Sequence, residues 1–255
     1  MIVITYPKSM NRNKFWNIFN PDINIDSGLL MKSTNQTARI AGLIYLLLSV
    51  TGAFSILYIP SRFINWADPS MTISQIESAE SLFRLGLYSG LMSNLFFLVL
   101  PLVLYVLLKP VNKNMAGLMV LFAVISIPVT LIALSHLFDV LALLNGSGTV
   151  MNTELLETRV MMSLQSYTSG TFVATLFWGL WLFPFGFLVY KSGFLPKFFG
   201  IFLMAGCFGY LIDFTGLALF PEWYGSTGIS GFIHFPSAIG EIGICFWLLI
   251  MGVKE

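Results

Sequence analysis

Five residues with acid–base side chains lie within or at the ends of long apolar runs: His136, Asp139, Asp213, His234 and Glu241. A charge near the middle of a bilayer costs roughly 2.5–3.5 kcal/mol on insertion scales, so such a residue is neutral, paired or functional. A carboxyl at that depth could hydrogen-bond a ligand or exchange a proton. Two histidines with a carboxylate could instead hold a metal ion that activates water.

The composition that surrounds these residues excludes a soluble globular protein. Of 255 residues, 56% are hydrophobic and 10% are charged, and the mean hydropathy is +0.83. Soluble domains carry roughly 25% charged residues. The apolar residues gather in runs of about 20, the length of a helix that crosses a hydrocarbon core of ~30 Å. We therefore predict an all-α polytopic membrane protein; a β-barrel would show short alternating segments instead.

Net charge and cysteine content add little about partners. The formal net charge of +1 gives no indication of nucleic-acid binding. Cys207 and Cys245 both fall within apolar runs, where thiols behave as small hydrophobic groups, so we expect packing residues and no disulfide.

The chain divides into a polar N-terminal extension, residues 1–36, and a six-span transmembrane domain, residues 37–255. The first span is expected to stop at Pro60, because proline disrupts a helix interior. The expected spans are about 40–58, 85–108, 115–143, 167–190, 198–220 and 229–253.

Two connections contain apolar residues at near-helical spacing. Residues 71–84 and 152–166 could each form an amphipathic helix on the membrane surface or simply extend the neighbouring span. Asn152 and Thr153 are good helix caps in either case.

The basic residues predict the orientation. Of the 13 Lys and Arg residues, the connections after the first, third and fifth spans hold three, Arg62, Arg84 and Arg159. Basic residues favour the cytoplasmic side, so we expect both termini in the cytoplasm of a cell-membrane protein with an acidic outer face.

Depth along the spans can be estimated from the 1.5 Å rise per residue of a helix. It places His136, Asp139 and His234 near the outer boundary, Asp213 in the outer third and Glu241 near the midplane. Asn94, Tyr210, Ser55 and Thr130 fall at matching depths. Because lipid cannot solvate such groups, we predict one outward-facing polar pocket with Glu241 at its floor and the other four titratable residues near its mouth.

Structural interpretations of the same residues stay open. Asp139 could cap a helix end beside an interfacial His136, Asp213 could hydrogen-bond a neighbouring helix, and His234 could serve a helix kinked at Pro236. In the aromatic run of residues 177–184, "FWGLWLFP", packing against lipid is expected rather than a ligand cage.

Long motifs carry a family resemblance over residues 37–253. They include "TARIAGLIYLLLSVTGAFSILYIPSRF", "ESLFRLGLYSGLMS", "LYVLLKPVNK", "FWGLWLFPFGFLVYKSGFLPKFFGIFLMAGCFGYLID" and "PSAIGEIGICFWLLIMGV". The chain resembles a family of bacterial multi-pass membrane proteins catalogued as a domain of unknown function. The resemblance implies six or seven spans and no particular activity.

Three functions fit these observations. The first is a binding or transport module for a small or amphipathic, lipid-like ligand, with Glu241, Asp213, Asp139, His136, His234, Asn94 and Tyr210 as binding residues. The second is a structural or accessory membrane subunit, and the third is a metal-dependent intramembrane enzyme. The spacings match no local metal motif, and no cofactor, catalytic residue or oligomeric state is assigned. The expected partners are the lipid bilayer and, for the first function, a small-molecule or lipid ligand.

Overall fold

The computed structural model describes residues 27–146 and 152–253, with side chains from Thr34 onward. Most of the expected N-terminal extension therefore lies outside the described residues. The described chain is helical and contains no strand. Its elements are α2 (Ser27–Ala53), η1 (Phe54–Tyr58), α3 (Ile59–Phe63), α4 (Pro69–Ser78), α5 (Glu80–Leu108), α6 (Lys113–Leu144), α7 (Thr153–Leu180), α8 (Leu182–Lys191), α9 (Lys197–Leu219), α10 (Pro221–Thr227), α11 (Ser230–Ile233), α12 (Phe235–Phe246) and η2 (Trp247–Met251).

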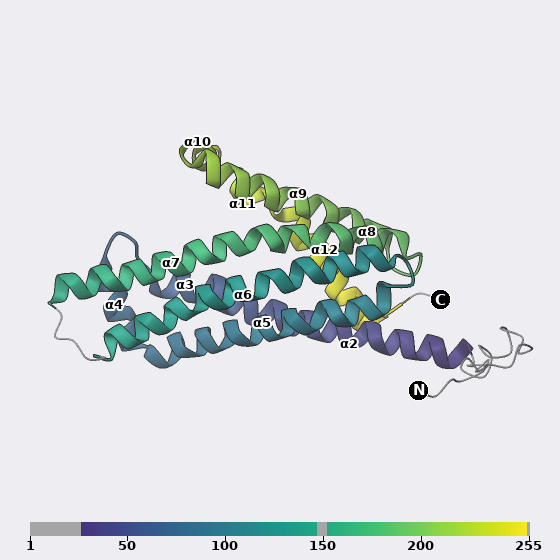
Figure 1. Cartoon of the computed structure of the whole chain (residues 1–255), viewed down its shortest axis with the longest axis horizontal. Helices are drawn as coiled ribbons and strands as arrows, with labels where there is room; N and C mark the ends of the chain where they lie inside the picture. Colours follow the sequence, from purple (N-terminus) through teal and green to yellow (C-terminus); the bar gives the residue numbers. More distant parts are fainter. Residues whose placement is uncertain (1–26, 147–151, 254–255) are drawn as a thin grey trace, which may run out of the picture.

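Six helical stretches in the described residues are long and apolar enough to cross a membrane, which confirms the predicted helical bundle. They are Thr34–Phe63, Glu80–Leu108, Lys113–Leu144, Thr153–Lys191, Lys197–Leu219 and Ser230–Met251. The start of α2 and the end of η2 lie at the same end of the bundle (Figure 1). We call this the proximal end and the opposite one, which carries α4 and α10, the distal end.

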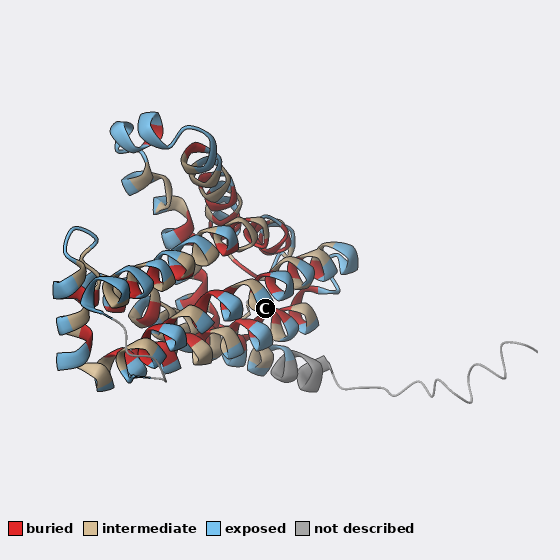
Figure 2. Ribbon diagram, turned by 60° about the vertical axis from the view of Figure 1, so that its left-hand side comes forward, coloured by how far each residue is buried: buried red, intermediate tan, exposed pale blue. Residues whose placement is uncertain are grey.

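The six spans pack in a closed ring. Each span packs on the next one in chain order. The fourth span contacts α9 through both α7 and α8. The last span, α12 with η2, packs back on α2 and so closes the ring. Buried residues line the inside of this ring and exposed ones its outside (Figure 2). The exposed side chains on the spans are largely apolar, for example Leu43, Val50 and Ile132, as expected where the surrounding solvent is lipid.

Glycines allow the last span to approach its two neighbours closely. A Cβ on Gly42 of α2 would lie 2.3 Å from the backbone nitrogen of Leu249, and one on Gly206 of α9 would lie 2.6 Å from the Cβ of Ser237. Small residues at such positions let membrane helices pack backbone to backbone. At the distal end, in contrast, α9 diverges from α7 (Figure 1).

The buried apolar residues form two clusters, one toward each end. The proximal cluster includes Ala38, Leu104 and Leu188. The distal cluster includes Phe63, Phe83 and Leu137. The interior between them is where the candidate site lies.

The two connections with apolar residues at helical spacing, residues 71–84 and 152–166, have different structures. Residues 152–166 extend the fourth span as the first half of α7, and the Asn152 side chain caps it by accepting from the Leu155 N–H at 2.9 Å. Residues 71–84 are divided: α4 is a separate short helix capped by Asp68, and α5 begins after it at Glu80.

The expected stop at Pro60 is wrong, because the first span continues to Phe63. Directly before this proline the helix widens into the π turn η1, in which the Ile59 N–H bonds to the Phe54 carbonyl. A regular α turn would bring the proline ring against the carbonyl four residues earlier. The wider turn explains how the helix passes Pro60 without ending.

Candidate functional site

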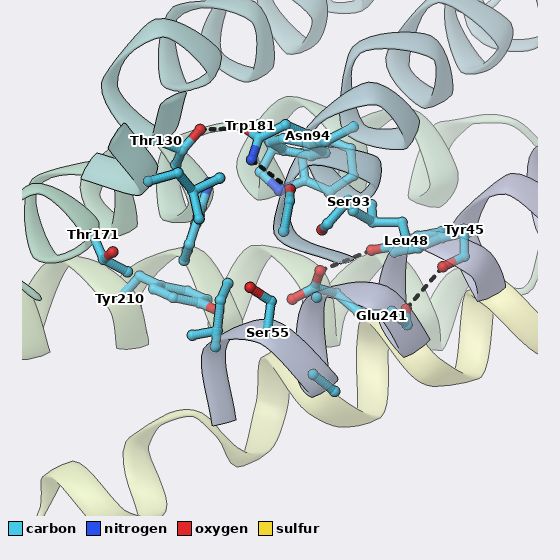
Figure 3. Close-up of a pocket in the computed structure, with 18 of the residues that line it drawn as sticks. Tyr45, Leu48, Ser55, Ser93, Asn94, Thr130, Thr171, Trp181, Tyr210 and Glu241 are labelled. Carbon is cyan, nitrogen blue, oxygen red and sulfur yellow. Dashed lines mark hydrogen bonds between the residues drawn. The ribbon is translucent and has the colours of Figure 1, made fainter. Parts of the chain in front are cut away.

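A cavity of about 250 Å³ lies between the two core clusters, and every span contributes to its wall. Its floor on the α12 side is Glu241, the one acidic residue in the lining (Figure 3). Neutral polar groups come from η1, α5, α6 and α7. They include Ser55, Ser93, Asn94, Thr130 and Thr171.

Glu241 is held by a residue from the opposite end of the sequence. The Tyr45 hydroxyl of α2 donates a hydrogen bond of 2.9 Å to Oε2 of Glu241. Tyr45 is 1% exposed, and its ring lies against the rings of Trp181 and Phe185. This packing fixes the phenol, so the carboxyl is oriented toward the cavity.

Asn94 and Thr130 form a second polar contact in the cavity wall. The Asn94 side-chain nitrogen donates to the Gly90 carbonyl at 2.9 Å, and its oxygen accepts from the Thr130 hydroxyl. Both ends of this amide are therefore satisfied within the protein, as buried polar groups require. The second N–H and the second lone pair of this amide remain for a ligand.

Aromatic rings form much of the remaining wall. The aromatic lining residues are Tyr45, Phe97, Tyr167, Trp178, Trp181 and Tyr210. Trp181 is 2% exposed and packs edge-on against Phe97 at 5.1 Å between ring centroids. The run of residues 177–184, expected to face lipid, thus turns its two tryptophans inward.

Irregular backbone lies next to the cavity in two spans. The π turn η1 supplies Ser55 and Ile56, and the interruption between α7 and α8 falls at Trp181. π turns inside helices are frequent at functional sites. In membranes, interrupted helices are tolerated where the backbone is buried in protein or lines a cavity.

Asp213 belongs to a separate cluster at the distal end of α9. Its Oδ1 accepts from the hydroxyls of Tyr224, at 3.0 Å, and Ser230, at 2.6 Å, and its Oδ2 lies 3.2 Å from Nε2 of His234. These contacts join α9 to α10 and α11. The cluster touches the cavity wall only indirectly, because the Tyr210 ring lies against the ring of His234.

His136 and Asp139 form a local pair on α6. Nδ1 of His136 lies 3.2 Å from Oδ2 of Asp139, and the two side chains are 34% and 60% exposed. Neither residue lines the cavity. An exposed pair of this kind contributes little to stability.

The structure therefore does not pool the acids in one pocket. Of the seven residues predicted from the sequence, Glu241, Asn94 and Tyr210 line the cavity, whereas Asp139, His136, Asp213 and His234 do not. Asp139 and Asp213 find partners among residues near them in the chain, so no shared recess is needed to satisfy them.

The described residues contain no group of three His, Cys, Asp or Glu side chains placed to hold a metal ion. The third functional alternative, a metal-dependent enzyme, depends on convergence of the two histidines with the acids. The geometry instead splits them between two distant pairs.

Comparisons with known proteins identify a matching family and a relative in an archaeon. A family model described as a domain of unknown function, DUF4386, matches residues 40–252. An uncharacterised protein of Archaeoglobus fulgidus is 32% identical over 151 residues, which cover 59% of this chain and 74% of that protein. No solved structure matches.

Proposed function

This chain belongs to the DUF4386 family, whose name assigns no activity, and we propose from its cavity that it is a membrane protein that binds a small amphipathic ligand inside its helical bundle. The observation that carries the proposal is the cavity itself, bounded by all six spans with Glu241 in its wall. The alternative of a purely structural or accessory subunit leaves this space without a role.

The size of the cavity supports a small ligand. A dry apolar cavity of about 150 Å³ is large enough to hold benzene, and the cavity here is about 250 Å³. Protein interiors are otherwise packed like organic crystals. A void of this size therefore removes packing contacts that a bound molecule would restore.

The lining supports an amphipathic ligand. Binding sites for small molecules are mostly apolar and aromatic, with a few polar groups that fix the orientation of the ligand. Trp178, Trp181 and Phe97 supply the apolar part here, and Glu241 supplies the polar group. A molecule with one polar end and an apolar body matches this division.

Filling the cavity tests the proposal. Thr171 lines the cavity from α7, whereas Thr175, one turn further along the same helix, does not. We expect native mass spectrometry of protein purified in nanodiscs to show a retained small molecule in the wild type and in Thr175→Phe, and to show its loss in Thr171→Phe. Equal spectra for all three proteins would contradict the proposed binding site and favour the structural role.

A further inference from the structure

The cavity has an unbalanced charge pattern. Its described lining contains one carboxyl, Glu241, and no Lys, Arg or His. Asp139 and Asp213 each have a histidine 3.2 Å away. Among the described residues, the hydrogen-bond partner of Glu241 is the neutral phenol of Tyr45. An ionised carboxyl in a protein interior is costly unless a cation pairs with it.

The aromatic rings that share the cavity with Glu241 are suited to a cation. Aromatic faces attract organic ammonium groups, and cages of Trp and Tyr are the usual way in which proteins bind quaternary ammonium groups. Trp178, Trp181 and Tyr210 share the cavity with Glu241. A carboxyl and several aromatic rings with no competing positive charge make a site complementary to an alkylated amine.

The two core clusters close the cavity toward both ends of the bundle, so its mouth lies on the side. Among the described lining residues, Ala53 of α2 is the exposed one. The half-buried ones include Glu241 of α12, Asn94 of α5, Thr171 and Trp178 of α7, and Tyr210 of α9. Two side-chain hydrogen bonds join α2 to α12. The Tyr45 hydroxyl donates to Glu241, and the Cys245 thiol donates to the Gly42 carbonyl. Both bonds lie on the proximal side of the cavity. The distal halves of the two helices thus border the mouth.

The rim of this mouth faces the hydrocarbon region of a bilayer. Exposed side chains on either side are apolar: Val50 on α2 and Leu57 on η1, and Ile239 and Ile242 on α12. A water-soluble ligand would have to cross lipid to reach such a mouth. A lipid-dissolved molecule reaches it by diffusion within the membrane.

We infer that the ligand is an amphipathic amine: its cationic head lies beside Glu241 among the aromatic rings, and its alkyl tail extends between α2 and α12 into the bilayer. This inference rests on the proposed function and specifies the chemical class of its ligand. The carboxyl recognises the charge, the rings recognise the alkylated nitrogen, and the lateral mouth accommodates the tail.

Three probes with the same eight-carbon chain test the inference: octyltrimethylammonium, 1-octanol and octanoate. Each is titrated into the full chain in phosphatidylcholine nanodiscs, and saturable changes in tryptophan fluorescence are followed against empty nanodiscs, since Trp178 and Trp181 line the cavity. We expect octyltrimethylammonium to bind about tenfold or more tightly than either other probe.

A matched pair of variants tests the role of the carboxyl. Glu241→Gln keeps the shape of the side chain and is expected to weaken octyltrimethylammonium binding about tenfold or more while leaving 1-octanol binding unchanged. Asp139→Asn removes an acid that lies outside the cavity in an exposed pair and is expected to leave the binding of all three probes unaffected.

The possible failures separate the two proposals. If 1-octanol or octanoate binds as tightly as octyltrimethylammonium, the cavity still binds ligands but the amine assignment is overturned. If no probe binds saturably, the binding function and the amine assignment are both overturned. If Glu241→Gln does not fold, the comparison of the three probes on the wild-type chain still decides.

Discussion

The Tyr45 hydroxyl donates to the Glu241 carboxyl at 2.9 Å and so joins the first span to the last across 196 positions of sequence. The bond closes the ring of helices at the floor of the cavity. It also gives a buried carboxyl a neutral partner, which orients the group without supplying a charge.

Tyr45→Phe is expected to destabilise the protein by about 1–3 kcal/mol, because it leaves the Glu241 oxygen without its hydrogen-bond donor. The measurement is reversible unfolding in mixed micelles. Tyr88→Phe is the control, since Tyr88 is 60% exposed on the outside of α5 and should change stability by less than about 0.5 kcal/mol. Equal effects of the two substitutions would mean that the Tyr45–Glu241 bond does not hold the ring together.

Gly42→Ala is expected to destabilise the protein by about 1–3 kcal/mol, because the added methyl group meets the backbone of Leu249 at 2.3 Å and forces α2 and η2 apart. Gly117→Ala on α6 meets nothing within 4 Å. It should be neutral or stabilising by up to about 1 kcal/mol, since alanine favours a helix more than glycine does. Thermal unfolding of the two variants in the same detergent checks the contrast.

Asp213→Ala is expected to loosen the distal end of the bundle, because three side chains from Tyr224 to His234 lose their shared acceptor. The amides of residues 221–234 should then exchange hydrogen faster by mass spectrometry. Asp139→Ala removes only an exposed pair and should leave exchange at residues 221–234 unchanged. Unchanged exchange in Asp213→Ala would show that the cluster does not anchor α10 and α11.

The carboxylate of Asp68 caps α4 from outside the spans. The Met71 N–H, at 2.9 Å, and the Ser70 hydroxyl stabilise the charged form and hold the pKa of Asp68 below its ordinary value. Because the pKa is lowered in the folded state, the stabilisation of α4 is complete at neutral pH and is lost only as the pH falls through this lowered pKa. Titration of labelled aspartate carboxyls by NMR should show a lowered pKa that is absent in Asp68→Asn.

The orientation of the chain is open to a labelling experiment. Native Cys207 and Cys245 are buried, so the unmodified protein should resist a membrane-impermeant maleimide on intact cells. With cytoplasmic termini, Ala67→Cys in the connection before α4 should be labelled and Asn114→Cys at the start of α6 should not. The reverse pattern would overturn the predicted topology.

The sequence was sufficient to locate the spans because bilayer thickness fixes the length of an apolar run. It was not sufficient to tell which side of each span faces inward. In a water-soluble helix the apolar face marks the interior, but a membrane helix is apolar toward lipid as well. Depth therefore placed Asp139 at the mouth of the shared pocket, whereas its side chain is 60% exposed on the outside of α6.

Because the inward side of a span could not be read from the sequence, part of the cavity lining was not predicted. Trp178 and Trp181 lie in a run with no polar face, so nothing in the pattern distinguished a cavity wall from a lipid contact. Tyr45 carried a usable signal, because tyrosine in membrane proteins is enriched at the interfaces and this one lies well inside its span. A phenol at that depth needs a hydrogen-bond partner, and Glu241 is the carboxyl at a similar depth.

The π turn η1 holds one residue more than a regular α-helix would hold at this point. Removing one residue would restore a regular helix in which Ile59 and Phe63 keep their buried side. The wide turn that presents Ser55 and Ile56 to the cavity would then be lost. Family members that lack one residue between Ala53 and Pro60 should therefore have a cavity of different shape. A one-residue gap at this place in a sequence alignment would identify them.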